Sequence, residues 1–273
     1  MDVLLWLQAV IMGLVEGITE FLPVSSTGHL ILAGHLLDFW TEDKRKLFEV
    51  AIQIGAIVAV IYEYWGKLWG ALVGALRGEL NGQRLALGLI VASVPIVVLG
   101  LTLGDVIKAY LFNPLTVALA LIVGGMVILW AEKREHQVVE QEVEQIGLKK
   151  AAAIGLIQCL ALIPGTSRSG ATIIGSLLMG VSRKAAAEFS FFLGIPVLMG
   201  AGLLDLFKHR HELVADDLVV LGIGMVTAFI SALLVIRALI RYVSRHDFTV
   251  FAWYRIGFGL LILLTSWTGL VHW

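Results

Sequence analysis

Long runs of apolar residues dominate this sequence and limit what it can fold into. Several are about twenty residues long, enough for a helix to cross a hydrocarbon core about 30 Å thick. Of the 273 residues, 59% are hydrophobic and only 15% are charged, whereas a soluble domain carries about 25% charged residues. The sequence therefore predicts an all-α polytopic membrane protein and not a β-barrel, whose strands would be short and alternating. The six expected spans cover residues 47–65, 85–103, 114–131, 188–206, 218–236 and 250–271.

Two further apolar regions, residues 3–37 and 148–181, are interrupted by polar breaks rich in proline, serine and glycine. This pattern predicts a re-entrant helix–loop–helix in each region. Unwound backbone is tolerated at membrane depth only where it is buried in protein or lines a wet cavity. We therefore expect both breaks to be enclosed by other helices or to face such a cavity.

The two interrupted regions are also copies of one another. Gly13-Leu-Val-Glu16 aligns with Gly155-Leu-Ile-Gln158, and Ser25-Ser-Thr-Gly28 falls on Ser167-Arg-Ser-Gly170 at the same offset of 142 residues. Each copy is followed by three spans, and an odd number of spans turns the second copy upside down relative to the first. The predicted organisation is a first repeat at 1–131, a charged and solvated linker at 132–147, and an inverted second repeat at 148–273.

Lysine and arginine residues predict the orientation of the chain. If the segments after the first, third and fifth spans are cytoplasmic, twelve of these residues lie inside and six outside. The twelve are Lys67, Arg77, Arg84, Lys133, Arg134, Lys149, Lys150, Arg183, Lys184, Arg237, Arg241 and Arg245. The count favours both termini outside, although the cluster Lys44–Lys46 runs against it.

Charge and cysteine content exclude some function classes. The net charge of −1 gives no indication of a nucleic-acid partner. The single cysteine, Cys159, excludes an internal disulfide and a cysteine-built metal site. We expect no cleaved signal peptide, because Asp2 stands where a basic region belongs and no small-residue cleavage site follows.

Glu16 and Glu20 are four residues apart, so on a helix they share a face. Carboxylates inside a membrane usually mark an ion or substrate path. Such a pair can bind a divalent cation through oxygen ligands, or one member can accept a proton. The alternative is a solvated pair at a helix end. The repeat weakens that alternative, because the polar residue Gln158 occupies the position equivalent to Glu16.

The first break continues with Ser25, Ser26 and Thr27. Hydroxyls and backbone N–H groups at a helix start form a natural anion site. A serine here could also be a nucleophile if a base is close, and Glu20 and His29 are the candidates in reach. The alternatives are an ordinary N-cap for the following helix and a histidine that takes no part in the chemistry.

The second break places Arg168 in an apolar setting among Ser167, Ser169 and Thr172. The planar guanidinium suits bidentate phosphate recognition, and the three hydroxyls add donors. The alternatives are an arginine that reaches the interface, or one that pairs with Glu16 or Glu20 only to hold the fold. Brought together, the two breaks supply the groups that phosphoryl transfer needs, and the membrane setting points to a lipid phosphate.

Other polar residues carry less information. Glu49, Gln53 and Glu188 lie near the starts of spans, where they either support the site or anchor helices, and the second interpretation is slightly favoured. Arg255 stands beside Trp253 and Tyr254, a combination that predicts an anchor at the membrane interface.

The whole chain closely resembles the bacterial undecaprenyl-diphosphate phosphatases of the bacitracin-resistance type. The most specific motifs are Glu16-Gly-Ile-Thr-Glu20, Pro23-Val-Ser-Ser-Thr-Gly-His29 and Pro164-Gly-Thr-Ser-Arg-Ser-Gly-Ala-Thr172. The resemblance implies a phosphohydrolase of the bacterial cytoplasmic membrane that removes the terminal phosphate of undecaprenyl diphosphate. This reaction regenerates the carrier lipid of peptidoglycan synthesis and confers bacitracin resistance. The resemblance further implies a need for Mg²⁺ or Ca²⁺ and a site that opens to the periplasmic side.

Carried over by motif, Glu16 and Glu20 are the acidic pair for metal binding and acid/base work. Ser26 resembles the proposed nucleophile and His29 its neighbouring acid/base, while Ser26, His29 and water all stay candidates for the attacking group. Arg168 matches the diphosphate-binding arginine. Ser25, Thr27, Ser167, Ser169 and Thr172 complete the expected substrate-binding set. The sequence is also compatible with a homodimer.

A polyprenyl-phosphate flippase or transporter is the rival interpretation, because inverted repeats with broken segments are typical of transporters. Phosphate release by the purified protein distinguishes the two. The type-2 phosphatidic-acid phosphatases are excluded, since the second break lacks the downstream histidine and the basic residue–proline motif of that class.

Overall fold

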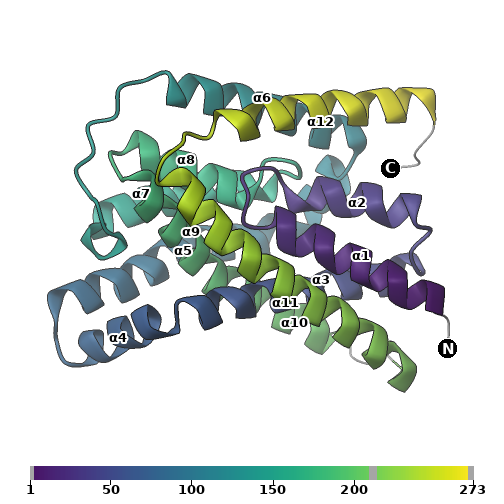
Figure 1. The fold of residues 1–273 in the computed structure, drawn as a ribbon, viewed down its shortest axis with the longest axis horizontal. Helices are drawn as coiled ribbons and strands as arrows, with labels where there is room; N and C mark the ends of the chain where they lie inside the picture. The colour runs from purple at the N-terminus through teal and green to yellow at the C-terminus, as the bar shows by residue number, and fades with distance from the viewer. Residues whose placement is uncertain (1–2, 209–213, 270–273) are drawn as a thin grey trace.

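The computed structural model describes residues 3–208 and 214–269, and within these ranges the chain is helical, with isolated bridge pairing but no β-strand (Figure 1). Five helical segments are long and apolar enough to span a membrane, and a bent pair makes a sixth. The predicted all-α polytopic fold is confirmed. The first half contains α1 (Val3–Thr19), α2 (Ser26–Leu36), α3 (Glu42–Glu63), α4 (Trp65–Leu76), α5 (Leu80–Leu111) and α6 (Pro114–Glu132). The second contains α7 (Leu148–Gln158), α8 (Arg168–Leu178), α9 (Arg183–Gly194), α10 (Gly200–Lys208), α11 (Ala215–Val243) and α12 (Thr249–Thr268).

The two halves pack reciprocally. Helix α1 packs along α11 of the other half, and α7 packs along α5 in the same way. Helices α6 and α12, the last of each half, lie side by side along the top of Figure 1. The order of elements therefore repeats as the alignment of the two breaks predicts. The inverted orientation of the halves in a membrane stays a prediction.

Two equivalent glycines allow the close approach of these helix pairs. A Cβ on Gly13 would lie 2.5 Å from the carbonyl oxygen of Gly224 in α11. A Cβ on Gly155 would lie 2.5 Å from the carbonyl oxygen of Ala92 in α5. Both distances are too short for any side chain. Gly13 and Gly155, which match in the alignment, therefore both lie at close helix–helix contacts and not in turns.

Both interrupted regions form a helix, a break and a second helix, as predicted. In the first region the break separates α1 from α2. In the second, a short 3₁₀ turn at Cys159–Leu162 and a loop separate α7 from α8. Both α2 and α8 are only 11 residues long, too short to cross a membrane.

Two of the expected spans are less regular than the apolar runs suggested. The first, expected at 47–65, lies almost wholly in α3, and the chain bends by 73° at its end, at Tyr64, before α4 begins. The fourth contains a π-helical segment, Ile195–Met199, between α9 and α10. Its second residue is Pro196, which has no N–H to continue an α-helical ladder. Hydropathy averaged over a window does not register either irregularity.

The linker between the halves is docked rather than wholly solvated. Val143 and Ile146 are 0% and 1% exposed and belong to the main apolar core. Glu142 and Glu144 lie 3.7 and 3.4 Å from the ammonium of Lys67. The charges that predicted a solvated linker are therefore partly used to hold it against α4.

Candidate active site

The two breaks bring α2 and α8 to a common centre, each entered through a strained serine. Ser25 precedes α2 with a φ of 71°, and Ser167 precedes α8 with a φ of 70°. Positive φ is unfavourable for a residue with a Cβ, so such positions persist only where the surrounding structure enforces them. They are equivalent in the repeat alignment. The strain is therefore a shared feature of the two loops.

The helix starts differ in how they are capped. Ser167 Oγ accepts a hydrogen bond from the backbone N–H of Gly170, 3.0 Å away, as an N-cap does. Ser25 makes no such side-chain bond in the described chain, so the N-cap interpretation does not hold for its hydroxyl. The first-turn N–H groups of α2, around Ser26 and Thr27, are thus left for an anion.

A hydrogen-bonded chain links the two breaks. Ser26 Oγ donates to Glu20 Oε2 at 2.6 Å, and Arg168 Nη2 donates to Glu20 Oε1 at 3.1 Å. All three residues are less than 10% exposed. Glu20 continues the helical ladder of α1 through its N–H to the carbonyl of Glu16, at 2.9 Å, so the two carboxylates share a face as predicted. The structure therefore joins a hydroxyl, a carboxylate and a guanidinium from opposite repeats.

Helix α9 positions the guanidinium from the opposite side. Arg168 Nη1 donates to the carbonyl oxygen of Ser190 at 2.6 Å. Thr172 Oγ1 donates to Ser190 Oγ at 2.7 Å. A Cβ on Gly194 would lie 3.1 Å from Arg168 Nη2, so a larger residue there would push the guanidinium by a few tenths of an ångström. Thr172 therefore acts on the site through Ser190, a residue that the sequence did not single out.

The other two hydroxyls of the second loop tie the loops together. Ser167 Oγ and Ser169 Oγ are 3.1 Å apart. Ser169 Oγ also donates to the carbonyl oxygen of Leu22 in the first loop, at 2.8 Å. Of these hydroxyls, Ser167 is in contact with the open cavity described next. Ser169 is 1% exposed and serves the loop–loop contact.

A cavity of about 800 Å³ lies beside these residues. Its polar end is formed by Glu20, Ser25, Ser26, Thr27, Ser167 and Arg168. Its walls come from α5, from the π-helical segment and α10, and from Val50 and Gln53 of α3. Gln53 thus faces the cavity, although the sequence favoured a helix anchor. The arrangement is a polar headgroup site at the end of a largely apolar chamber, which suits a lipid with a charged head.

Glu16 lies deeper than the cavity lining. It is 1% exposed, and neither carboxylate oxygen accepts a hydrogen bond within the described residues. A buried carboxylate without partners is strongly unfavourable unless a cation or proton neutralises it. The carboxylate of Glu20 lies on the same helix face, and carboxylate oxygens are ligands that Mg²⁺ and Ca²⁺ prefer. Among the described residues no group of three or more His, Cys, Asp or Glu could hold a metal, so a cation here would need substrate oxygens or water as well.

His29 faces away from the carboxylates. Its Nδ1 lies 2.7 Å from the carbonyl oxygen of Ser25, and its Nε2 lies 2.7 Å from the hydroxyl of Tyr254. The ring stacks on Phe258 with centroids 4.0 Å apart. A carbonyl only accepts, so Nδ1 carries a proton, and in the neutral ring Nε2 accepts from Tyr254. In this geometry His29 supports the Ser25 backbone, and both of its ring nitrogens have partners other than the Ser26 hydroxyl.

The structure corrects the prediction for Arg255. This residue is 1% exposed and is not an interfacial anchor. Its guanidinium donates to the carbonyl oxygens of Pro23 at 3.2 Å and Gly165 at 3.1 Å, one in each loop. It also donates to those of Ala120 and Leu121 in α6. Arg255 therefore clamps both breaks to α6, and its aromatic neighbours concealed this role in the sequence.

Glu188 is a structural residue, as the sequence favoured. It is 4% exposed and accepts from the ammonium of Lys67 at 2.7 Å, away from the cavity. Ser190, two residues later, is the functional neighbour. Ser190 does not line the cavity itself, since it is 0% exposed, and it acts only through its contacts with Arg168 and Thr172.

The fold is that of a polytopic membrane protein, and its candidate anion site is built from two broken helical segments. The chain matches the family of bacitracin resistance protein BacA over residues 9–261. It is 62% identical to undecaprenyl-diphosphatase 1 of Acinetobacter baylyi, with all of both chains covered. It is 59% identical to undecaprenyl-diphosphatase of Psychrobacter cryohalolentis (98% of this chain, 97% of the relative) and 57% identical to that of Nitrosomonas europaea (100% and 99%). The chain therefore belongs to the BacA family.

Proposed function

We propose that this protein is an undecaprenyl-diphosphate phosphatase, which hydrolyses the terminal phosphate of its lipid substrate and returns undecaprenyl phosphate to envelope synthesis. The observation that carries the proposal is the chain Ser26–Glu20–Arg168 at the polar end of a membrane-embedded cavity. The names of the full-length relatives support the substrate. A flippase would need to hold the diphosphate but not a hydroxyl already bonded to a base, so it is not favoured.

The first half-reaction transfers the terminal phosphoryl group to Ser26. Glu20 Oε2 takes the proton of Ser26 Oγ, the bond from Oγ to the terminal phosphorus forms, and the bond from that phosphorus to the bridging oxygen breaks. The bridging oxygen and its electron pair leave with undecaprenyl phosphate. Arg168 and the free N–H groups at the start of α2 stabilise the charge on the transferring group.

The second half-reaction restores the enzyme. Water attacks the phosphoserine phosphorus, the bond from phosphorus to Ser26 Oγ breaks, and Oγ regains the proton held by Glu20. The water oxygen and its two protons leave as part of inorganic phosphate. In both halves Arg168 keeps the carboxylate of Glu20 oriented toward the serine.

A divalent cation fits this site at Glu16, with Glu20 on the same helix face. When bound, it would neutralise diphosphate charge and the buried carboxylate of Glu16. The corresponding test is Glu16→Gln, which copies Gln158 of the second repeat. We expect the Mg²⁺ concentration for half-maximal activity to rise about tenfold or more. An unchanged Mg²⁺ requirement would remove Glu16 from cation binding.

His29 acts as a positioning residue in this scheme. Its bond to the Ser25 carbonyl holds the strained backbone from which α2 begins. The sequence allowed His29 to attack or to act as the acid/base, and the contacts with Ser25 and Tyr254 favour Ser26 as the attacking group and Glu20 as its base.

The setting in the cell is also part of the proposal. The lysine and arginine distribution supports placement in the bacterial cytoplasmic membrane with the cavity opening to the periplasmic side. The double variant Cys159→Ser/Lys208→Cys has a single cysteine in the cavity lining, and labelling it from the periplasmic side would test the orientation. The homodimer stays a prediction, and the mass of the detergent-purified particle would test it.

The decisive experiment is phosphate release from undecaprenyl diphosphate by purified wild type, with Mg²⁺ and with EDTA, beside Ser26→Ala. Wild type should release phosphate, and the serine variant should bind lipid but not release it. With radiolabelled terminal phosphate, a covalent label should appear on wild type and be absent from Ser26→Ala. If wild type binds the lipid but releases no phosphate, the proposed phosphatase activity is excluded. Release without a label would instead indicate direct attack by water.

A further inference from the structure

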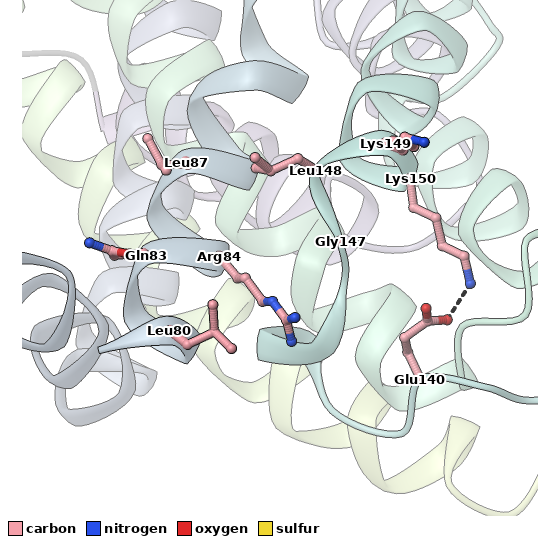
Figure 2. A pocket seen from close by; sticks show the side chains of 9 residues that line it. All are labelled: Leu80, Gln83, Arg84, Leu87, Glu140, Gly147, Leu148, Lys149 and Lys150. Atoms are coloured by element: carbon pink, nitrogen blue, oxygen red, sulfur yellow. Dashed lines mark hydrogen bonds and ion pairs between the residues drawn. The ribbon is translucent and has the colours of Figure 1, made fainter. Parts of the chain in front are cut away.

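A second hollow, of about 520 Å³, lies between the start of α5 and the start of α7 (Figure 2). It shares no lining residue with the active-site cavity. Arg84 in its wall and Val97 in the wall of the active site are both on α5, roughly 20 Å apart along the helix. The hollow is therefore a separate feature, at the other end of the same span.

Three cations line this hollow, and two of them are unpaired. Lys150 binds the carboxylate of Glu140 at 2.5 Å, and Figure 2 shows this pair at one side of the hollow. Arg84 and Lys149 make no hydrogen bond or ion pair with any residue that the structure describes. In Figure 2 the side chain of Arg84 extends from α5 toward the segment that leads into α7. The hollow thus presents an excess of positive charge to a ligand.

A neighbouring hollow of about 470 Å³ provides a contrast. Its Arg183 is ion-paired with Glu132, and its Lys184 lies 3.6 Å from Glu142. These cations are used to dock the linker. Other basic residues on this side, such as Arg77 and Lys133, also lack an ion pair within the described residues, so Arg84 and Lys149 differ from them by lining a hollow together with exposed leucines.

Apolar side chains surround the cations. Leu80, Leu87 and Leu148 line the same hollow and are 59%, 47% and 43% exposed. Leu80 is the first residue of a helical segment that is long and apolar enough to span a membrane, so this rim lies near one end of that segment. Free phosphate would leave these leucines exposed, whereas the acyl chains of a lipid would cover them.

We propose that this hollow binds the headgroup of an anionic phospholipid from the cytoplasmic leaflet. The phosphodiester lies between Arg84 and Lys149, and the acyl chains run along Leu80, Leu87 and Leu148. The arginine fork and an ammonium together suit a phosphate group, and basic pockets between spans on the cytoplasmic side are known to hold such lipids. The first backbone N–H groups of α7, which follow Gly147, have no side-chain cap and add to the positive electrostatic potential that attracts a phosphate.

Native mass spectrometry of the detergent-purified protein tests this proposal. Wild type should retain phosphatidylglycerol, and the double variant Arg84→Gln/Lys149→Gln should bind it about tenfold to a hundredfold more weakly, because two charge-assisted contacts are lost. The matched control Arg77→Gln/Lys133→Gln removes the same charge from exposed positions outside the hollow and should bind as wild type does. Equal loss in both variants, or no loss in the first, would overturn the proposal.

Two further measurements complete the test. The first distinguishes a lipid phosphate from free phosphate, and the second applies if the double variant does not fold. Phosphatidylcholine and inorganic phosphate should not displace phosphatidylglycerol, and displacement by inorganic phosphate would identify an anion site rather than a lipid site. If the double variant fails to fold, wild type is photolabelled with a phosphatidylglycerol carrying a photoreactive acyl chain. Label on the peptides containing Leu80 to Leu87 or Leu148 supports the site, and label elsewhere alone contradicts it.

Discussion

Ser25 and Ser167 occupy equivalent positions in the two halves, and their φ angles of 71° and 70° are nearly the same. Their side chains act differently. Ser167 caps α8, whereas Ser25 leaves the start of α2 uncapped beside the cavity. The first loop supplies the carboxylate and hydroxyl, and the second supplies Arg168. The same backbone conformation therefore begins two helices whose side chains differ: the first leaves its amides uncapped beside the cavity, and the second presents Arg168.

The largest expected effect comes from removing the carboxylate of the first loop. In Glu20→Gln the base for Ser26 and the partner of Arg168 are both lost, so phosphate release should fall roughly 10²–10⁴-fold. Steady-state release with saturating Mg²⁺ measures it. Glu63→Gln is the control, because Glu63 pairs with Arg237 outside the site and should keep near-normal turnover. A Glu20→Gln enzyme within a factor of three of wild type would contradict the assignment.

The second loop is tested by Arg168→Lys. An ammonium keeps the charge but cannot hold Glu20, the Ser190 carbonyl and a phosphate in a forked geometry, so turnover should fall about 10²-fold or more while the protein still folds. Turnover and circular dichroism measure the two outcomes. The matched change Arg183→Lys alters an arginine that holds the linker, and its turnover should stay close to wild type. Near-normal turnover in Arg168→Lys would remove Arg168 from the reaction.

The spans and the two loops could be predicted from residue patterns in the sequence. Apolar runs predicted the spans, because hydrocarbon thickness fixes helix length regardless of tertiary contacts. Polar residues in matching breaks predicted the site, because neither Glu20 nor Arg168 is tolerated at membrane depth without a partner. The pairing of Glu20 with Arg168, weighed as a way to hold the fold, is present in the structure and lies at the polar end of the cavity.

Other features depend on contacts that the sequence does not encode locally. His29 and its partner Tyr254 are 225 residues apart. Arg255 has the same aromatic neighbours whether it lies at the interface or, as here, in the interior. The bend between α3 and α4 lies at Tyr64, inside an apolar stretch in which no residue pattern marks a helix end. Tertiary partners, not propensity, decide each of these cases.

Arg255 joins the two loops, and its removal tests whether they depend on a shared clamp. In Arg255→Met, the carbonyls of Pro23 and Gly165 lose their donor inside the protein, so the free energy of unfolding should fall by about 2–3 kcal/mol. Denaturant titration in mild detergent measures it, and turnover should fall as well because both loops shift. Arg241→Met, at an exposed position of α11, is the control and should change stability by less than about 0.5 kcal/mol. Equal stability of the two variants would show that the loops hold their geometry without the clamp.

The smallest expected effect is a difference in stability between alanine variants of the two serines. Ser167→Ala removes the cap on the Gly170 N–H and should lower the free energy of unfolding by about 1 kcal/mol. Ser25→Ala removes no cap and keeps the same backbone strain, so its stability should stay within about 0.5 kcal/mol of wild type. Each alanine serves as the control for the other, because burial and φ match. If Ser25→Ala loses as much stability as Ser167→Ala, the first helix start is capped too, and its amides are not free to bind phosphate.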